Sequence, residues 1–435
     1  MGIQNILFIL VFAFAVVLFT KNVRKVIRNI RLGMPLDRTD RKAERWKLML
    51  KVALGQSKMV VRPIPAILHL FVYVGFVIIN IEILEIIIDG FFGTHRVFAP
   101  LLGSFYNFLI GSFEVLALLV LVGVVAFFAR RNFIYIKRFR QKDLDGWPKS
   151  DANIILITEV FLMSAFLVMN STDAILQTRM VEHYSQAGWF PISNLLVPAF
   201  SHLSTEALIM IERGTWWFHI LGILAFLNYL VYSKHFHIIL AFPNVWYANL
   251  EAKGRIRNMP EVANEVKRMM DPSAVVPEPE GAVKFGARDV HDLSWKSLLD
   301  AYTCTECGRC TSECPANITG KLLSPRLVMM KTRDRLEEVG RNIDKNKGQF
   351  VPDGKSLLHD YISPEELWAC TTCNACVQAC PVNIDPLSII IDLRRQLVME
   401  ESAPPPALAS MFSNMENNGA PWQYGQADRL KWTEE

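Results

Sequence analysis

The eight cysteines of this 435-residue chain are the residues whose spacing most clearly predicts chemistry. They form two groups with one pattern, in which each of the first three cysteines is separated by two residues and a fourth follows after three. A proline comes directly after the fourth. The repeated Cys-x2-Cys-x2-Cys-x3-Cys-Pro pattern is typical of proteins that bind two [4Fe-4S] clusters. The groups are Cys304, Cys307, Cys310 and Cys314, then Cys370, Cys373, Cys376 and Cys380.

The pattern also predicts how the eight thiolates divide between two clusters. Three cysteines in one short loop can cap a cubane from one direction, whereas the fourth thiolate must arrive from elsewhere in the chain. We therefore expect each group to send its last cysteine to the other cluster, which places the two clusters close together. Cluster 1 is expected to take Cys304, Cys307, Cys310 and Cys380, and cluster 2 to take Cys370, Cys373, Cys376 and Cys314.

A pair of zinc sites is the alternative, since zinc also binds Cys-x2-Cys motifs. Two runs of four cysteines, ending before Pro315 and Pro381, favour clusters instead. All eight cysteines of the chain belong to these runs, so none remains for a structural disulfide. This usage fits a reducing compartment.

The elements that position this region include membrane helices, because long apolar runs fill the first half of the chain. Hydrophobic residues make up 51% of the sequence, which is high for a soluble protein. Each run approaches the ~20 residues that a helix needs to cross a bilayer. The runs cover residues 3–20, 64–88, 105–128, 154–169 and 216–232.

Basic segments between these runs predict the topology. The segment 21–62 carries thirteen Lys and Arg against three acidic residues, and the segment 129–153 is also basic. By the positive-inside rule both face the cytoplasm. We expect a multi-pass inner-membrane protein with its N-terminus outside and its cysteines in the cytoplasm. A cleavable signal peptide at 1–22 is disfavoured, since no basic n-region precedes the apolar run, and the net charge of +4 does not indicate a nucleic-acid partner.

The expected fold class is mainly α, with a five-helix transmembrane bundle followed by a cytoplasmic α-helical two-[4Fe-4S] ferredoxin-type domain. Helical spacing flanks the cysteines at 325–339 and 386–398. A stretch rich in Pro, Glu and Gly at 271–286 indicates a linker. The expected parts are a membrane domain at 1–245, a linker at 246–292, the cluster domain at 293–400 and an extended partner-docking tail at 401–435.

Histidines at the fifth apolar run predict haem ligands. If residues 216–237 formed one helix, His219 and His237 would lie on one face about 27 Å apart, and His235 would point elsewhere. Such depths suit axial ligands of haems in opposite leaflets. His69, near the cytoplasmic start of the second run, shares the depth of His237. His69 and His237 are therefore the expected pair for one haem b, with hydrogen bonds to loops as the alternative role.

A second haem would use His219, nearer the other face of the membrane. No histidine lies near Ile79 in the second run, where a partner of His219 would be expected. The second ligand would have to come from His95, His183 or His202 in the loops.

Four glutamates lie within or near the apolar runs, where a carboxylate is costly and usually has a partner or an aqueous path. They could carry protons to or from a quinone. Their depth near an interface is the alternative explanation. These residues are Glu82, Glu85, Glu114 and Glu159.

The chain resembles known redox proteins in both halves. Residues 1–240 resemble the haem b gamma subunit of respiratory nitrate reductase and the membrane subunit of methanogen heterodisulfide reductase. The resemblance rests on five spans and on the motifs H-I-L-G-I-L-A-F and Y-S-K-H-F-H. It implies that Ser233, Lys234 and His237 lie where the family has its cytoplasmic-side haem ligand. The second histidine that the family has in its second span is missing here.

From about residue 290 the chain resembles the ferredoxin part of the catalytic heterodisulfide reductase subunit. This resemblance includes the tail motif N-M-E-N-N-G-A-P-W, with Arg429 and Trp432. Larger relatives continue into cysteine-rich catalytic repeats, which this sequence lacks. We therefore expect residues 403–435 to dock a separate cytoplasmic subunit, either one with such repeats or a flavoprotein.

These observations predict a membrane-bound electron-transfer subunit of a respiratory oxidoreductase. Electrons would pass between a menaquinone-type pool, haem b, two [4Fe-4S] clusters and the cytoplasmic partner. No Gly-rich nucleotide-binding fingerprint lies between a predicted strand and helix. The alternative is a haem-free membrane-anchored ferredoxin that serves as an assembly platform. A redox-sensing regulator is disfavoured because no output domain is recognisable.

Overall fold

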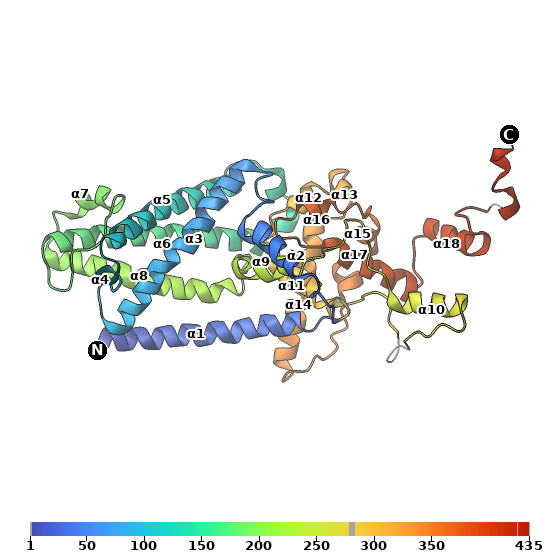
Figure 1. The fold of residues 1–435 in the computed structure, drawn as a ribbon, viewed down its shortest axis with the longest axis horizontal. Coiled ribbons are helices and arrows are strands. Elements are labelled where there is room, and N and C mark those ends of the chain that lie inside the picture. The colour runs from blue at the N-terminus through green and yellow to red at the C-terminus, as the bar shows by residue number, and fades with distance from the viewer. Residues whose placement is uncertain (1, 278–282, 424, 435) are drawn as a thin grey trace.

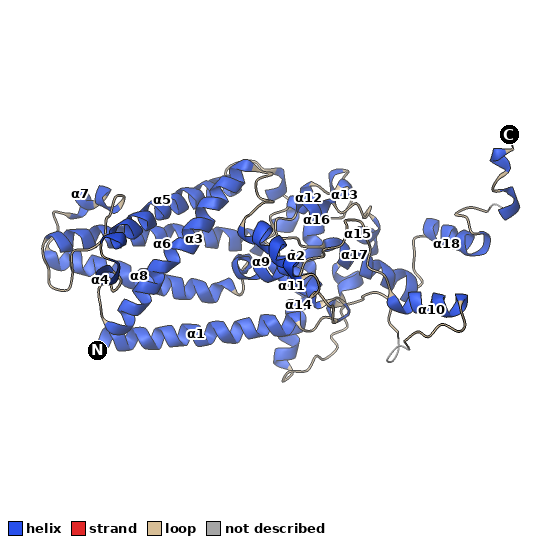
Figure 2. Cartoon of the chain, in the orientation of Figure 1, coloured by secondary structure: helices blue, strands red, loops and turns tan. Residues whose placement is uncertain are grey.

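The computed structural model describes residues 2–277, 283–423 and 425–434. Within these ranges the chain is mainly α-helical, as Figure 2 shows. The long apolar helices of the first half form a bundle at one end of the molecule, and the shorter helices around the cysteines gather beside it (Figure 1). The expected fold class, long apolar helices followed by a helical cysteine region, is confirmed.

Five long helices form the bundle, and each covers all or nearly all of one predicted apolar run. α3 packs on α5, α5 on α6 and α6 on α8, while α1 lies against α3 and α8. A proline in the first turn, Pro63, starts α3, and Gly93, with a left-handed φ of 72°, ends it. The bounds are α1 Ile3–Ile30, α3 Pro63–Phe92, α5 Ser104–Asn132, α6 Trp147–Thr178 and α8 Thr205–Leu230.

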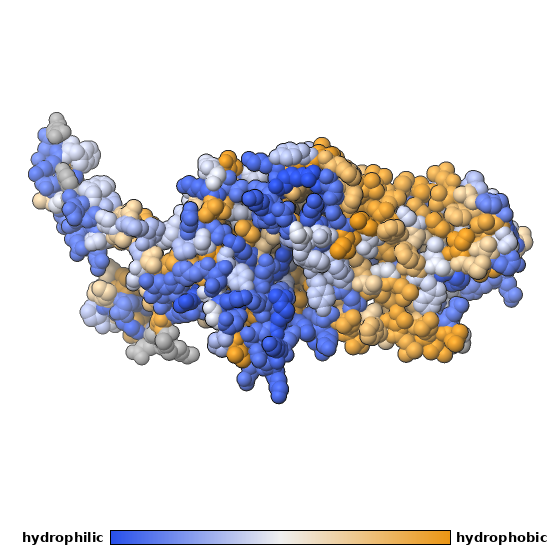
Figure 3. Space-filling view, turned by 180° about the vertical axis from the view of Figure 1, so that it is seen from behind, coloured by the Kyte–Doolittle hydropathy of each residue, from blue (hydrophilic) through white to orange (hydrophobic). Residues whose placement is uncertain are grey.

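The composition of these helices fits a lipid environment. Four of them are long and apolar enough to cross a membrane, and α8 with the short helical segment that follows it makes a fifth candidate span. Large apolar side chains point outward, for example Leu10 and Phe14 of α1 and Phe108 of α5. Figure 3 shows a largely hydrophobic surface on the bundle and a largely hydrophilic surface on the cysteine region. The chain is a membrane protein with several candidate spans.

The chain bends by 90° after α8, before the segment Lys234–Trp246. That segment comprises the short 3-10 turn η5 (Lys234–Phe236) and α9 (His237–Trp246). The expectation of one continuous helix over residues 216–237 is therefore wrong, and His219 and His237 do not share a helix face. The cause is Asp151 of α6, which accepts hydrogen bonds from the Ser233 hydroxyl (2.7 Å) and the Lys234 backbone N–H (3.1 Å) and so holds Ser233 in an extended conformation.

The cysteine region is built on the 21-residue helix α14. Its apolar face, including Val328, Leu336 and Val339, is buried in one core with residues of the surrounding helices, such as Leu298 and Leu393. The other helices are α11 Trp295–Thr303, α12 Arg309–Ser312, α13 Pro315–Ile318, α15 Pro364–Trp368, α16 Ala375–Ala379 and α17 Pro386–Arg395, and α14 spans Pro325–Lys345.

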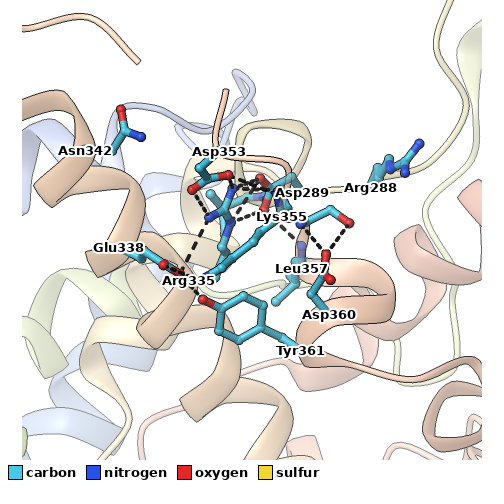
Figure 4. Close-up of polar contacts among 12 residues, drawn as sticks. Arg288, Asp289, Arg335, Glu338, Asn342, Asp353, Lys355, Leu357, Asp360 and Tyr361 are labelled. Atoms are coloured by element: carbon cyan, nitrogen blue, oxygen red, sulfur yellow. Dashed lines mark hydrogen bonds and ion pairs between the residues drawn. The ribbon is translucent and has the colours of Figure 1, made fainter. Parts of the chain in front are cut away.

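Arg335 of α14 fixes two distant segments of this region (Figure 4). Its side chain is fully buried and donates to Asp289 (2.7 Å), to Asp353 (3.0 Å) and to the Lys355 carbonyl (2.8 Å). Asp289 also accepts from the Leu357 backbone N–H at 3.1 Å. Because both carboxylates are bound to one guanidinium, the loop after α14 and the segment before α11 are held on the same helix.

Two predicted irregular segments contain helices. Residues 246–292, expected as a linker, include α10 (Pro260–Met270), and residues 278–282 of that segment lie outside the described residues. The tail expected to be extended at 401–435 includes α18 (Pro406–Asn418), which begins at a proline and ends at Gly419, with a φ of 62°. Figure 1 shows α10 and α18 at the end of the molecule farthest from the bundle.

Short elements complete the described chain. They are α2 Lys42–Met49, η1 Leu50–Leu54, α4 Ala99–Leu102, η2 Lys137–Phe139, η3 Lys142–Leu144, η4 Ser193–Leu195, α7 Val197–Phe200, η6 Val290–Asp292, η7 Leu357–Tyr361, η8 Gln396–Glu400, η9 Gln426–Asp428 and η10 Lys431–Thr433.

The cysteine region docks directly on the end of the bundle. α1 contacts α11 and α14. Just after α1, Met34 forms an isolated parallel β-bridge with Ser294, and the indole N–H of Trp295 donates to the Leu36 carbonyl at 2.9 Å. A side chain at Gly33 would meet the backbone of Trp295 at 2.6 Å, so only glycine allows this approach.

Candidate functional site

The two cysteine groups have the same backbone conformation as well as the same spacing. In the first loop Glu306 and Gly308 have left-handed φ values of 56° and 70°. In the second loop Thr372 and Asn374, at the same offsets from the first cysteine, have φ values of 55° and 61°. Non-glycine residues rarely adopt this conformation. The repetition indicates two loops shaped for the same type of ligand.

A short helix follows each loop, α12 in the first and α16 in the second, and the two helices pack against each other. This packing brings the last cysteine of each group toward the other loop. Burial raises the pKa of Cys310 well above its ordinary value, and the nearby thiols of Cys307, Cys304 and Cys380 raise it further. Cys380 is thus beside the first loop, as crossed ligation requires.

At the second loop the nearby cysteine from the other group is Cys314. Burial raises the pKa of Cys370, and the nearby Cys314 contributes to the increase. Burial also raises the pKa of Cys376 to about 12, with contributions from Asp385, Cys370 and Cys314. The structure therefore places Cys380 near the first group and Cys314 near the second, as the spacing predicts, and it also places Cys376 near Cys310. Which cysteine binds which cluster stays a prediction.

The donor atoms fit iron–sulfur clusters. All eight cysteines are free thiols, and most are buried or half-buried. Backbone N–H groups point at the sulfurs of two of them, from Thr372 to Cys370 (3.4 Å) and from Ile384 to Cys380 (3.3 Å), as is usual where sulfur carries negative charge. In the described part of the chain, no group of three or more His, Cys, Asp or Glu side chains is arranged around one metal ion.

Glu306, inside the first cysteine loop, joins this loop to the membrane helices. Its carboxylate is 2% exposed and forms ion pairs with Lys234, after α8, and with Arg333 of α14. Burial by itself would raise the pKa of Glu306, yet the two cations hold it below its ordinary value. The carboxylate therefore stays ionised, and one buried charge connects both halves of the chain.

The first basic segment also contacts the cysteine loops. The Lys58 ammonium donates to the carbonyls of Cys380 (3.2 Å) and Val377 (3.4 Å). Arg309, between two cysteines, donates to the Lys58 carbonyl at 3.1 Å. From the sequence, this basic segment was expected to set the orientation and contact lipid, because nothing in the local pattern distinguishes a lysine near lipid from one near a protein surface.

A second basic segment docks on α14. Arg326 is almost fully buried and is bound by Asp143, by the Gln141 side chain (2.7 Å) and by the Arg138 carbonyl (2.9 Å). These three residues belong to the predicted inner loop at 129–153. Both predicted inner loops and the segment after α8 thus meet the cysteine region at one end of the bundle.

The histidines expected to bind haem b lie at this same end. His69 of α3 is within electrostatic range of His237, at the start of α9, and of Arg309 in the first cysteine loop. His237 Nδ1 lies 3.0 Å from the Lys234 carbonyl, while the buried Nδ1 of His69 has no partner. His235, expected to point elsewhere, lies edge-to-face against His237, with ring centroids 5.6 Å apart, because the chain bends here. His69 and His237 thus lie at the same end of the bundle, by a different route from the predicted straight helix, and their pairing as haem ligands stays a prediction.

His219 is buried in the bundle, 1% exposed, between α6 and α8. Its Nδ1 lies 3.0 Å from the Leu162 carbonyl, and its Nε2 is buried without a partner. A carbonyl on one ring nitrogen and a free second nitrogen are usual for a metal-binding histidine. His202 is exposed, and His95 and His183 lie in the loops at the far end of the bundle.

Three of the four predicted glutamates belong to a buried polar network at that far end. Glu85 accepts from the Tyr106 hydroxyl (2.7 Å), and Glu114 accepts from the backbone of Ile192 (2.8 Å) and Ser193 (3.0 Å). Arg96 and Asp173 form the centre of the network and are joined by a 2.7 Å ion pair. Neither residue was predicted from the sequence, because Arg96 lies in a loop and Asp173 lies beyond the end of an apolar run. Glu82 lines the adjacent cavity, and Glu159 lies on α6 away from the network.

Residues 303–384, which include all eight cysteines, match the 4Fe-4S dicluster domain family. FadF of Bacillus subtilis (strain 168), a probable iron-sulfur-binding oxidoreductase, is 29% identical over 99% of this chain and 61% of its own length. The EtfAB:quinone oxidoreductase of Syntrophomonas wolfei is 28% identical over 92% of this chain and 55% of its own length. The chain thus spans somewhat more than half the length of these two relatives.

Shorter matches agree with the expected resemblance of the cysteine region. A probable membrane-anchored ferredoxin of Chromohalobacter salexigens is 32% identical over 34% of this chain and 24% of its own length. Subunits C and D of Methanosarcina heterodisulfide reductases also match parts of the chain. No solved structure matches it. The haem-binding half of the expected resemblance finds no support in these matches.

The chain is therefore a membrane-associated iron–sulfur electron-transfer protein. Cysteines of its dicluster region bind two [4Fe-4S] clusters, and long apolar helices hold this region at the membrane.

Proposed function

We propose that the chain carries electrons between a soluble redox partner of the EtfAB kind and a membrane quinone. The name of the Syntrophomonas wolfei relative, which aligns with 92% of this chain, supports this pair of partners. The proposed orientation places the cysteine region and the basic segments 21–62 and 129–153 in the cytoplasm, as the positive-inside rule favours.

One observation carries the proposal: the first cysteine loop is attached to the membrane helices through the buried Glu306–Lys234 ion pair. A domain that is only tethered would hang from its anchor by a linker. Here Lys58, Glu306 and Arg326 each bridge the two halves through buried or half-buried contacts. Fixed placement matters because electron transfer slows exponentially with distance.

The cysteines would hold the clusters, which supply one-electron storage at a potential set by charge, hydrogen bonds and burial. The surrounding protein supplies these charges and hydrogen bonds. Lys58 places a cation against the backbone of Cys380, and the N–H groups of Thr372 and Ile384 face sulfur atoms. The exposed Cys373 indicates that the second cluster lies nearer the surface, where a soluble partner can approach.

We further propose that His69 and His237 hold a haem b beside the first cysteine loop. Their proximity and the unpartnered Nδ1 of His69 support this pair. His219, with its orphaned Nε2, is the proposed ligand of a second haem. Haem would add a one-electron carrier within the membrane.

A second candidate function is a haem-free membrane-anchored ferredoxin, favoured by the match to the Chromohalobacter salexigens protein over a third of the chain. A Soret band in the protein purified in mild detergent separates the two. Because a second haem at His219 would keep a Soret band, bound haem is counted per chain: His69→Ala and His237→Ala should each remove the same haem, and the exposed His359→Asn control should not. Absence of the Soret band from the wild-type protein would exclude the haem and favour the haem-free ferredoxin.

The proposed soluble partner is tested by mixing the oxidised, purified protein with reduced EtfAB in the absence of quinone. The visible absorbance of the clusters should bleach to the extent that dithionite reaches. A variant lacking residues 403–435 should bleach far more slowly, because we propose this tail as the docking segment. If dithionite bleaches the clusters and reduced EtfAB does not, the EtfAB-kind partner must be given up.

A further inference from the structure

A cavity of about 350 Å³ lies at the end of the bundle opposite the cysteine region. It is bounded by the first turns of α1, the last turns of α3 and the first half of α8, with the loop after α3 on one side. Its walls include the aromatic rings of Phe8, Trp216 and Trp217. Two of its lining residues, His95 and Glu82, each have a buried polar atom without a partner, which is costly unless a ligand or water binds it.

The first of these polar atoms is Nδ1 of His95, which is buried and has no partner. On the other side of the ring, Nε2 lies 3.1 Å from the Asp173 carboxylate. A carboxylate can only accept, so Nε2 carries the proton of the neutral ring and Nδ1 is left as an acceptor. Asp173 is in turn fixed by Arg96 at 2.7 Å. The histidine is thus oriented as a base.

The second is Oε2 of Glu82, on α3, which is buried and has no partner either. The other carboxylate oxygen is 3.6 Å from Arg96, and the residue is 2% exposed. His95 and Glu82 therefore line the cavity from two elements, the loop after α3 and α3 itself. Arg96 pairs with both nearby carboxylates, Glu82 and Asp173. Arg96 itself stacks on Phe190 at 5.0 Å and is almost fully buried.

We propose that this cavity binds the ring of a membrane quinone, with His95 Nδ1 and Glu82 Oε2 exchanging protons with its two oxygens. The inference rests on the proposed function and assigns its quinone site. An apolar aromatic wall with two acid–base groups beside it suits a flat ring whose oxygens take up protons. The position at the end of a membrane bundle suits an apolar tail.

Reduction of the quinone takes two electrons, which the iron–sulfur centres of the chain supply one at a time. Two O–H bonds form on the ring oxygens, and the N–H bond of protonated His95 and the O–H bond of protonated Glu82 break. Oxidation of a hydroquinone is the reverse, with His95 and Glu82 as the proton acceptors.

The cavity lies far from the cysteine region along the bundle. Trp216 lies fourteen residues before the end of α8 at Leu230, which is about 21 Å along the helix axis. The cysteine region begins beyond that point. Electron transfer between the clusters and a quinone this far away needs an intermediate electron carrier. His219, three residues after Trp216 on α8, is at a suitable depth to bind a haem that serves as this carrier.

The test uses full-length protein in mild detergent with its clusters reduced by a stoichiometric amount of dithionite. Menadione is then added in a stopped-flow instrument, and reoxidation of the clusters is recorded by visible absorbance. Wild-type protein should be reoxidised. The His95→Phe variant should be slowed by about 10²-fold or more, the size usual for loss of a proton-transfer group, and Glu82→Gln by at least about tenfold.

Matched controls are Glu182→Gln and Glu206→Gln, which change exposed residues at the same end of the bundle, outside the cavity. Both should react like the wild type, and all variants should retain the same cluster absorbance. Glu82→Gln keeps the shape of the side chain and remains informative if His95→Phe fails to fold. A second readout is binding of 2-heptyl-4-hydroxyquinoline N-oxide, a hydroquinone mimic, which His95→Phe should weaken at least tenfold.

Two results would overturn the assignment, and they differ in what else they affect. Wild-type reoxidation with unaltered rates in both cavity variants removes the quinone from this cavity but leaves the proposed function in place. Absence of wild-type reoxidation by menadione, with ferricyanide still able to reoxidise the clusters, overturns the proposed function together with this site.

Discussion

At the scale of single residues, Glu306 has the most consequential position. It lies between two cysteines of the first loop, and its carboxylate is shared by a cation from the membrane part and a cation from α14. Removing one member of a buried ion-pair group leaves the other charges unpaired, which is more costly than losing an exposed pair.

We predict that Glu306→Gln destabilises the protein by about 3 kcal/mol, because Lys234 and Arg333 are left without their anion. It should also raise the reduction potential of cluster 1, since a negative charge beside the cluster disfavours the reduced state. Thermal unfolding and an EPR redox titration measure the two effects. The matched control is Glu313→Gln, in the same loop, whose pair with Arg62 is largely exposed and should matter by less than about 1 kcal/mol. Equal effects of the two variants would contradict this account of Glu306.

The crossed ligation leads to a second prediction at this scale. Cys314→Ser should perturb the EPR signal of the cluster held by Cys370, Cys373 and Cys376, because Cys314 lies beside that set. The signal of the other cluster should persist. Cys373→Ser should perturb the same signal as Cys314→Ser. Loss of the other cluster from the Cys314 variant would show that each group binds its own cluster.

At the scale of elements, the bend after α8 marks the limit of what the sequence could predict. The cysteine spacing is a local pattern, and it predicted both loops and the approach of each group's last cysteine to the other group. The apolar runs likewise predicted the five long helices. The bend depends on Asp151, 82 residues before Ser233, and no glycine or proline at the bend announces it. The same holds for Arg326 and Asp143, which are 183 residues apart.

Substitution of Arg335 tests whether α14 is the scaffold that holds the segments of the cysteine region together. We predict that Arg335→Met costs about 3 kcal/mol, because Asp289 and Asp353 lose their shared partner. Hydrogen exchange should rise in the loop after α14 while the bundle stays protected. The control Lys355→Ala breaks a mostly exposed pair with Glu338 and should change stability by less than about 1 kcal/mol. Unchanged hydrogen exchange in the loop after α14 of the Arg335→Met variant would show that Arg335 does not hold this loop in place.

At the scale of the whole molecule, the two halves behave as one unit because the cysteine region is docked on the bundle over several contacts. Electron transfer across the junction requires that docking to persist. One close approach of the backbone at the junction is at Gly33, where the chain leaving α1 passes the backbone of Trp295.

We predict that Gly33→Ala loosens the junction, since its Cβ would lie 2.6 Å from the Trp295 nitrogen and 2.8 Å from the Leu293 carbonyl. Neither backbone atom can move as a side chain would. Hydrogen exchange around residues 31–36 and 293–295 should increase, and both clusters should remain. Gly214→Ala is the control, because nothing lies within 4 Å of its added Cβ. Equal exchange in the two variants would show that the junction tolerates the displacement.

The central claim is that the iron–sulfur region and the membrane bundle form one electron-transfer unit that reacts with quinone. The most direct test is freeze-quench EPR after mixing the fully reduced, purified protein with excess menadione. Two clusters hold two electrons, so the account predicts that both cluster signals disappear and that at least one menadiol forms per chain. Cluster signals that persist in excess menadione, yet vanish with ferricyanide, would contradict the claim.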